Sequence, residues 1–257
     1  MEINQDRWLA SIFGHNVFRI GIDSRDVSGE KSRCEIAATI RGHAAEQKAA
    51  MYYSKVDTKE VELVRQFIAA GLYVVDVNIT FAIETPSNRT QASAGEIAIS
   101  EVQSEHREKV LEIAGSCFRY SRFHLDPLVS QQIADQVKHD WILNYISKKR
   151  GERLWAALIG ERPVGFLAVL ASESNGKRIR TIDLVGVDRS FQGRGVGNSL
   201  GSFFISKYGG DCDLLQVGTQ AANVPSMRLY EKLGFSISST QYVLHMHVRD
   251  GVQRIGC

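Results

Sequence analysis

Apolar residues recur at helical spacing in two segments of the chain, 105–117 and 130–147, and this periodicity predicts two helices there. The pattern then changes to short apolar runs that are typical of strands, at 154–159, 164–171 and 178–187. Turn-forming residues separate these runs, at Gly160–Pro163 and Asn175–Gly176. We therefore expect two helices followed by an antiparallel meander of three strands.

A glycine-rich turn, Gln-Gly-Arg-Gly-Val-Gly at 192–197, directly follows the third strand. The amphipathic pattern after it predicts a helix that ends at Gly209. A strand at 214–219, a helix that begins near Pro225 and a strand at 239–247 complete the pattern. Alternating helices and strands of this kind predict an α/β (α+β) fold with a mixed central sheet.

The polar stretch 87–96 predicts a linker between two domains, 1–86 and 97–257. The smaller N-terminal α/β domain contains a strand, a helix, a glycine and a strand within 51–83, and this order matches that of 214–247. Gly71 then corresponds to Gly234, and Phe67 to Tyr230. Either a degenerate repeat or a chance similarity explains the match. Because no glycine-rich turn precedes the N-terminal copy, we expect no phosphate site in it.

The overall composition excludes several classes of protein. The chain has 257 residues, 44% of them hydrophobic and 23% charged, and a formal net charge of +2, which are values typical of a globular protein. This charge balance gives no reason to expect binding to nucleic acid or membrane, and the apolar runs are too short for a membrane span. Four widely spaced cysteines and the lack of a secretory pattern at the N-terminus predict reduced thiols and a cytoplasmic location.

The turn at 192–197 has the arrangement of an anion site, since glycines admit a ligand to the backbone and the amides at a helix start attract phosphate. A Walker loop would need Gly-Lys-Ser/Thr, which is absent from the turn. A dinucleotide fingerprint would need a third glycine, but Asn198 or Leu200 stands at that position. The third interpretation is a cradle for the pyrophosphate of coenzyme A.

This turn resembles the acyl-CoA motif of the GNAT family of N-acetyltransferases. The segments 219–223 (Thr-Gln-Ala-Ala-Asn) and 229–235 (Leu-Tyr-Glu-Lys-Leu-Gly-Phe) are similar to the family's later Asn, Tyr and Gly-Phe positions. The resemblance covers about residues 97–248 and implies a GNAT fold there. The smaller N-terminal domain is then either a degenerate half of this fold or similar to it by chance. Ser121-Arg122-Phe123 and the segment 239–242 further resemble the members of this family that acetylate the 4-amine of a dTDP-linked deoxyamino sugar, fucosamine.

The resemblance implies acetyl-CoA as co-substrate and direct attack of an amine on the thioester. It implies that the following residues bind the coenzyme: Leu184, Val185, Val187, Gln192, Gly193, Arg194, Gly195, Val196, Gly197, Asn223 and Tyr230. An amide of the 184–187 strand would polarise the thioester carbonyl. Tyr230 is the candidate general acid for the departing thiolate, unless it is an ordinary core tyrosine. Asn223 would contact the pantetheine arm, cap the helix, or do both.

The general base stays open between Asp183, His124, Asp126 and an ordered water. The loop 118–127 is expected to form part of the acceptor site, with Arg119 and Arg122 pairing with a diphosphate, Tyr120 or Phe123 stacking, and His124 and Asp183 nearby. The alternative is a surface loop with solvated arginines. His245 and His247 share a strand face, but two histidines without a third ligand rarely bind a metal, so none is expected.

Three functions remain in competition. The first is N-acetylation of a primary amine on a nucleotide-linked amino sugar. The second keeps acetyl-CoA and replaces the acceptor by a protein, a peptide or a small amine. The third is a non-catalytic acyl-CoA sensor. The partner is thus a small-molecule amine in the favoured interpretation, and the oligomeric state stays open between a monomer and a homodimer.

Overall fold

The structure is a computed structural model that describes residues 1–22, 30–84 and 96–254. It divides into two compact units: residues 1–78, 121–133 and 240–257 form unit 1, and residues 79–120 and 134–239 form unit 2. This division differs from the expected contiguous domains, because β4 (Tyr73–Glu84) and β10 (Ser236–Arg249) each contribute residues to both units. Residues 87–95 of the expected linker lie outside the described residues.

Unit 1 contains a mixed sheet in the order β1-β2-β3-β10, with β11 beside β10. β2 and β3 are parallel, whereas the β1–β2 and β3–β10 pairs are antiparallel. Besides its parts of β4 and β10, unit 1 contains β1 (Glu2–Gln5), α1 (Arg7–Phe13), β2 (Asn16–Gly21), α2 (Glu30–Ala45), β3 (Ala49–Asp57), α3 (Val61–Ala70), α5 (Arg122–Leu125) and β11 (Val252–Arg254). The strand and helix that begin the 51–83 pattern correspond to β3 and α3, whereas the hydrophobic pattern did not reveal the others.

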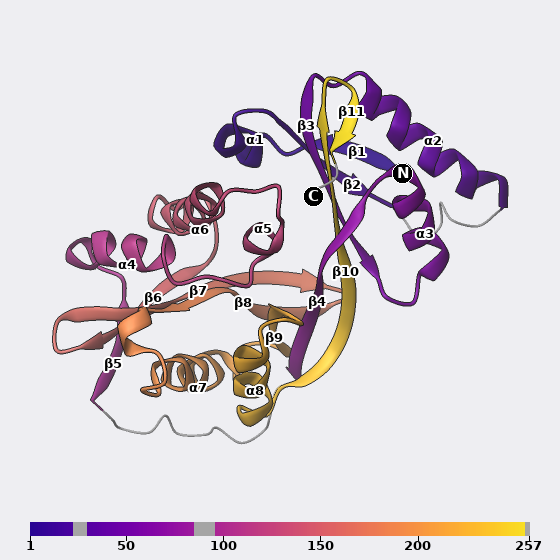
Figure 1. Ribbon diagram of the computed structural model, residues 1–257. Coiled ribbons are helices and arrows are strands. Elements are labelled where there is room, and N and C mark those ends of the chain that lie inside the picture. Colours follow the sequence, from indigo (N-terminus) through magenta and orange to yellow (C-terminus); the bar gives the residue numbers. More distant parts are fainter. Residues whose placement is uncertain (23–29, 85–95, 255–257) are drawn as a thin grey trace. The chain divides into compact units, whose positions relative to one another are not determined.

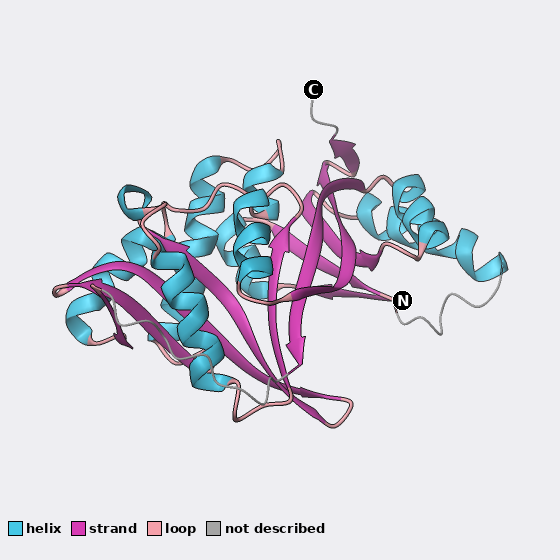
Figure 2. Cartoon of the chain, turned by 90° about the horizontal axis from the view of Figure 1, so that it is seen from below, coloured by secondary structure: helices cyan, strands magenta, loops and turns pink. Residues whose placement is uncertain are grey.

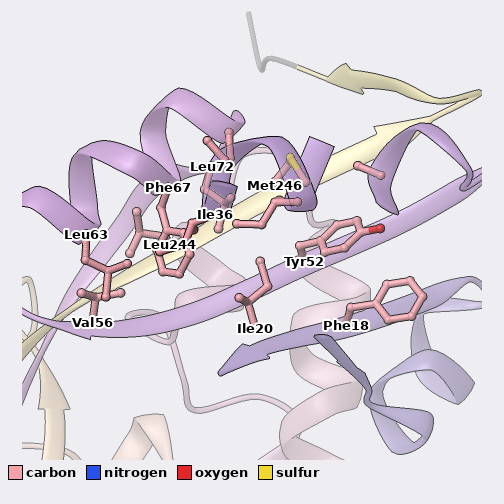
Figure 3. Packing of buried hydrophobic residues seen from close by; sticks show 14 of the residues in the cluster. Phe18, Ile20, Ile36, Tyr52, Val56, Leu63, Phe67, Leu72, Leu244 and Met246 are labelled. Carbon is pink, nitrogen blue, oxygen red and sulfur yellow. The ribbon is translucent and has the colours of Figure 1, made fainter. Parts of the chain in front are cut away.

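Helices α2 and α3 close the hydrophobic core of unit 1 (Figure 1). Figure 3 shows Ile20, Tyr52 and Val56 from the strands against Phe67 of α3 and Leu244 of β10. Phe67 and Tyr52 are fully buried. Full burial of an aromatic side chain contributes about 1.5–3 kcal/mol, so this core explains why α3 packs although it has only ten residues.

Unit 2 contains mixed strands in the order β4-β9-β8-β7-β6-β5. The expected meander is confirmed, since β6, β7 and β8 pair antiparallel, and β5 extends it antiparallel to β6. The expected helices and strands occur in the expected order, with β5, η2 and η3 in addition. The elements that lie wholly or mainly in unit 2 are β5 (Ile97–Glu101), η2 (Ser104–His106), α4 (Arg107–Ala114), α6 (Gln131–Ile146), β6 (Arg153–Ile159), β7 (Arg162–Ser174), β8 (Lys177–Val187), η3 (Arg189–Phe191), α7 (Val196–Tyr208), β9 (Leu214–Gln220) and α8 (Val224–Lys232).

Helices cover both faces of the unit 2 sheet. Figure 1 shows α4 and α6 on one face and α7 and α8 on the other, and Figure 2 distinguishes helices in cyan from strands in magenta. Val110, Ile142 and Phe166 belong to the core under α4 and α6, whereas Leu200 and Phe204 belong to the core under α7. Among the described helices, none is both long enough and apolar enough to cross a bilayer.

The two units share one succession of elements. In each, a helix connects two parallel strands and a second helix follows: β2-α2-β3-α3 in unit 1 and β8-α7-β9-α8 in unit 2. Both second helices end at a left-handed glycine, Gly71 (φ +105°) and Gly234 (φ +90°). In both, the next amide closes the last turn, from Leu72 to the Phe67 carbonyl and from Phe235 to the Tyr230 carbonyl. The proposed correspondence of Phe67 with Tyr230 thus extends to backbone hydrogen bonding.

Candidate active site

A bulge divides β8 at Asp183. Ala168 of β7 pairs with Leu184, and the next residue, Val169, pairs with Ile182, so Asp183 is the extra residue. On its other edge β8 pairs with β9 only from Ile179 to Ile182. Residues 184–187 therefore have no ladder partner in β9 within the described part of the chain. Leu184, Val185 and Val187, which were expected to bind the coenzyme, lie on this part of β8, where the Val187 carbonyl already accepts from the Gln192 side chain.

The glycine turn is open and directly precedes a helix. Gly193 (φ +76°) and Gly195 (φ +86°) are in the left-handed region that favours glycine, and a Cβ at either position would meet nothing within 4 Å. Gly195 is the N-cap of α7, so the amides of Val196 and Gly197 have no acceptor within the helix. Empty space beside Gly193 and Gly195 thus coincides with the unpaired amides at the start of α7, which is what an anionic phosphate group requires.

Side-chain hydrogen bonds within unit 2 hold the N-terminal end of the turn and the residues just before it. The Gln192 amide donates to the Val187 carbonyl at 3.2 Å. Asp188 accepts from the Ser190 amide at 3.0 Å and from its hydroxyl at 2.7 Å, and Lys109 lies 3.3 Å from the same carboxylate. These hydrogen bonds, first that of the Ser190 hydroxyl, lower the pKa of Asp188. Arg194 of the exposed turn rests over the Phe191 ring, with 5.2 Å between Cζ and the ring centroid.

Helix α8 presents Asn223 and Tyr230. The Asn223 side chain accepts from the Ser226 amide at 3.4 Å and donates to the Thr219 hydroxyl at 3.2 Å, so it caps the helix. Tyr230 is 4% exposed and packs against Phe81 and Phe235. Burial raises the pKa of Tyr230 despite a hydrogen bond with Ser226, and the phenol stays protonated at neutral pH.

Asp183 is held by three side chains. Trp141 Nε1 donates to its carboxylate at 2.7 Å, the Tyr145 hydroxyl at 2.8 Å and Arg150 Nε at 2.8 Å. Burial would raise the pKa of Asp183, but the hydrogen bonds from Arg150 and Trp141 outweigh it and lower the pKa. The carboxylate is therefore ionised, and its acceptor positions are directed at groups of the protein.

Cys117 lies beside the strand that would carry the thioester. A Cβ on Gly186 would lie 2.8 Å from Cys117 Sγ and 2.6 Å from the Phe166 ring, so glycine is required at this position. Burial raises the pKa of the Cys117 thiol to about 12. Since the thiolate is the nucleophilic form, Cys117 is not equipped to form a covalent acyl intermediate.

The loop expected at the acceptor divides into two parts. Arg119 and Tyr120, in unit 2, are exposed, and Tyr120 retains 37% of its accessible surface. From Ser121 onward the chain belongs to unit 1 and is largely buried. The Arg122 guanidinium lies 3.9 Å over the Tyr53 ring, and Phe123 is 1% exposed.

The other loop candidate, His124, shares a 2.6 Å hydrogen bond between its Nδ1 and the Ser121 hydroxyl. The six expected acceptor residues therefore do not share one environment. Arg119 and Tyr120 face solvent, whereas Arg122 and Phe123 pack within unit 1 and Asp183 is engaged by α6 and Arg150.

Asp126 joins His245 and His247 of β10, a juxtaposition that the sequence did not reveal. Asp126 Oδ2 lies 2.6 Å from His245 Nδ1 and 2.9 Å from His247 Nε2. The other oxygen accepts from the Tyr73 hydroxyl at 2.7 Å and from the Leu128 amide at 2.9 Å. The two histidines thus have a third residue of metal-binding type beside them, contrary to our expectation. Strand spacing alone identifies the histidine pair, but only the fold brings the carboxylate to it.

Comparisons with known proteins agree with this geometry. The sequence model of the acetyltransferase (GNAT) family matches residues 107–235, just over half of the chain. A Bacillus subtilis (strain 168) protein, spore coat polysaccharide biosynthesis protein SpsD, is 27% identical over 140 residues, which are 54% of this chain and 47% of that protein. N-acetylaspartate synthetase from Danio rerio is 28% identical over 152 residues, 56% of this chain and 50% of that protein. The chain spans about half the length of these curated relatives.

Solved structures show the same fold over more of the chain. A GCN5-related N-acetyltransferase from Sphaerobacter thermophilus superposes with a TM-score of 0.62 at 15% identity, covering 98% of this chain and 78% of that one. A tandem GNAT protein from the clavulanic acid biosynthesis pathway superposes with a TM-score of 0.59 at 11% identity, covering 90% and 75%. With the glycine turn before α7 and the family match over 107–235, these results show that the chain belongs to the GNAT family of N-acetyltransferase enzymes.

Proposed function

We propose that this chain transfers an acetyl group from acetyl-CoA to a primary amine by direct attack. The GNAT fold uses acetyl-CoA as co-substrate. One observation carries the proposal: unit 2 has both an anion-binding turn and, next to it in the chain, a stretch of β8 that no longer pairs with β9. The turn at 193–197 suits the pyrophosphate, and the edge of 184–187 that does not pair with β9 suits the amide-bearing pantetheine arm.

Different groups of the protein act on different parts of the reaction. The new bond joins the amine nitrogen to the acetyl carbon, and the carbon–sulfur bond breaks. A main-chain amide of 184–187 stabilises the charge that develops on the carbonyl oxygen. Tyr230, protonated because burial raises its pKa, gives its proton to the departing thiolate and is then reprotonated from solvent, which takes up the proton that leaves the amine. The high pKa of Cys117, about 12, favours this single displacement over an acyl-cysteine route.

The proton that leaves the amine goes to water in this proposal. Asp183 is a poor base because Arg150, Trp141 and Tyr145 already bind its carboxylate and its pKa is lowered. Asp126 is equally occupied, by four donors. An amine of moderate pKa releases this proton to solvent without a dedicated carboxylate, so neither residue needs to act.

The acceptor we favour is a nucleotide-linked amino sugar. Two observations support it: SpsD, a relative over half of the chain, is named for polysaccharide biosynthesis, and two residues adjacent in the sequence, Arg119 and Tyr120, expose a cation and an aromatic ring. A guanidinium pairs with a diphosphate, and a phenol ring stacks on a base or sugar. A small carboxylate-bearing amine is the second candidate, because the other relative is named N-acetylaspartate synthetase.

The test is thiol release from acetyl-CoA with a panel of acceptors: dTDP- and UDP-linked 4-amino sugars, free amino sugars, aspartate, polyamines and a peptide. Fast release with one nucleotide-linked sugar supports the favoured acceptor. Release with aspartate, a polyamine or the peptide alone supports N-acetyltransferase activity and contradicts a nucleotide-linked sugar as the acceptor. Binding of acetyl-CoA without release from any acceptor contradicts the enzymatic proposal and favours a sensor.

A further inference from the structure

Ser226 lies one helical turn before Tyr230 on α8, where side chains four residues apart are neighbours on one face of the helix. Its side chain forms a hydrogen bond with the phenol. The rings of Phe81 and Phe235 also pack against Tyr230, with centroids 5.7 Å and 6.1 Å from that of the tyrosine ring. A phenylalanine ring has no N–H or O–H to offer the phenol oxygen. Ser226 therefore supplies a polar contact that these two rings cannot.

The first turn of α8 holds Ser226 in place. The Ser226 amide donates to Asn223 Oδ1 at 3.4 Å, and the side-chain amide of Asn223 donates to the Thr219 hydroxyl of β9 at 3.2 Å. Thr219 is buried, so these bonds attach the start of the helix to a packed strand. Pro225, whose ring fixes φ, directly precedes Ser226. The backbone that carries the serine hydroxyl is thus fixed one turn before the phenol.

The hydrogen bond runs from Ser226 to Tyr230. It lowers the pKa of Tyr230 against the larger, opposite effect of burial, so it favours the phenolate. Since a phenolate can only accept, the serine hydroxyl is the donor. A phenol O–H lies close to the plane of its ring and has two preferred directions. A donor on one side leaves the other side for the proton, so the contact turns the proton of Tyr230 away from Ser226.

We infer that Ser226 is a positioning residue for the general acid: its hydroxyl donates to the Tyr230 oxygen, directs the phenol proton away from itself and stabilises the phenolate that remains after proton transfer. The inference rests on the proposed function, in which Tyr230 protonates the thiolate. In that step the O–H bond of Tyr230 breaks, an S–H bond forms, and the negative charge moves from sulfur to the phenol oxygen. A buried charge needs a hydrogen-bond donor, so the contact strengthens as the proton leaves. Ser226 itself touches no substrate in this scheme.

The principal variant is Ser226→Ala, which removes the hydroxyl and introduces a good helix former. Ser226→Thr keeps a hydroxyl at the same position and tests for rescue. Ser206→Ala is the matched control, because Ser206 is another half-buried serine on a helix of unit 2, near the C-terminal end of α7. Ser226→Ala is also combined with Tyr230→Phe, in which no phenol proton remains to be positioned.

The first readout is kcat, from thiol release by acetyl-CoA with a dTDP-linked 4-amino sugar or with whichever member of the acceptor panel releases thiol fastest. We expect Ser226→Ala to lower kcat about tenfold, the effect of losing one hydrogen bond to a charged group, and to leave the acetyl-CoA Kd within about twofold. Ser226→Thr should recover most of the loss, and Ser206→Ala should change neither value. Added to Tyr230→Phe, Ser226→Ala should lower kcat by less than about twofold, because residues that act as a unit have non-additive effects.

The second readout needs no turnover. Trifluorotyrosine at position 230 has a more acidic phenol than tyrosine, and fluorine NMR follows its titration in the folded protein. Ser226→Ala should raise the pKa of this phenol by about one pH unit, because the phenolate loses a donor, whereas Ser206→Ala should leave it unchanged.

Three results overturn the inference. They are an unchanged kcat in Ser226→Ala, an equal loss of kcat with and without the Tyr230 hydroxyl, and an unchanged phenol pKa in the NMR titration. The second would mean that Ser226 acts on the structure of α8 and not on the acid. If the unmodified protein acetylates no acceptor of the panel, the proposed function fails separately, and the titration still decides whether Ser226 donates to the phenol.

Discussion

Arg150 binds the carboxylate of Asp183 with two parallel hydrogen bonds, from Nε to Oδ2 at 2.8 Å and from Nη2 to Oδ1 at 2.9 Å. The bulge in β8 turns Asp183 out of the ladder, and α6 adds Trp141 and Tyr145 as further donors. A carboxylate near the reacting strand is a natural candidate for a general base. Here its partners make it a structural anchor between β8 and α6.

Asp183→Asn is therefore expected to lower stability by about 1–3 kcal/mol, because buried donors lose a charged acceptor, and to leave the pH profile of kcat/KM unchanged. The pKa of Asp183 is lower in the folded than in the unfolded chain, so its stabilisation is present above about pH 4 and is lost as pH falls further. Thermal unfolding at pH 7 and about pH 3.5 should show a smaller difference between variant and parent at the lower pH. Loss of the acidic limb of the pH–rate profile would show instead that Asp183 is the base.

Gly195→Ala should weaken acetyl-CoA binding more than its effect on folding explains. The left-handed backbone at Gly195 (φ +86°) costs a residue with a Cβ about 1–2 kcal/mol. Gly176→Ala is the matched control, since Gly176 also has positive φ (+72°) and open space around it, but lies in the β7–β8 turn. Both variants should lose similar stability in denaturant titrations. A raised acetyl-CoA Kd by calorimetry should appear only in Gly195→Ala, and equal Kd values would remove the turn from the coenzyme site.

The sequence predicts a feature of this site only where the residues that form it lie close together in the chain. The turn at 192–197 and the ends of α7 and α8 are local, because glycine, Pro225 and Asn223 act within a few residues, and they were predicted. The contact of Asp126 with His245 spans 119 positions and depends on β10 pairing with β3 in unit 1. No local pattern contains that information. Likewise, nothing in the sequence around Asp183 reveals the register shift that aims it at α6.

Tyr230→Phe should reduce kcat by about 10²–10⁴-fold, the usual contribution of a positioned general acid, while the Kd for acetyl-CoA changes little. Tyr208→Phe is the control, since it removes another buried hydroxyl of unit 2, one that accepts from Trp155 at 3.0 Å in the core under α7. Stopped-flow thiol release separates the chemical step from binding. Equal rates for the two variants would show that Tyr230 is only a core tyrosine.

The two loop arginines should respond in opposite ways to truncation. Arg119 is exposed, so Arg119→Ala should raise the KM for a nucleotide-linked acceptor and change stability by less than about 0.5 kcal/mol. Arg122 stacks on Tyr53 and donates to His245, so Arg122→Ala should lower Tm through loss of both contacts. Steady-state kinetics with the dTDP- and UDP-linked sugars, together with thermal unfolding, separates the two roles. A diphosphate bound by Arg122 instead would show as an increase of the acceptor KM in Arg122→Ala that exceeds the increase in Arg119→Ala.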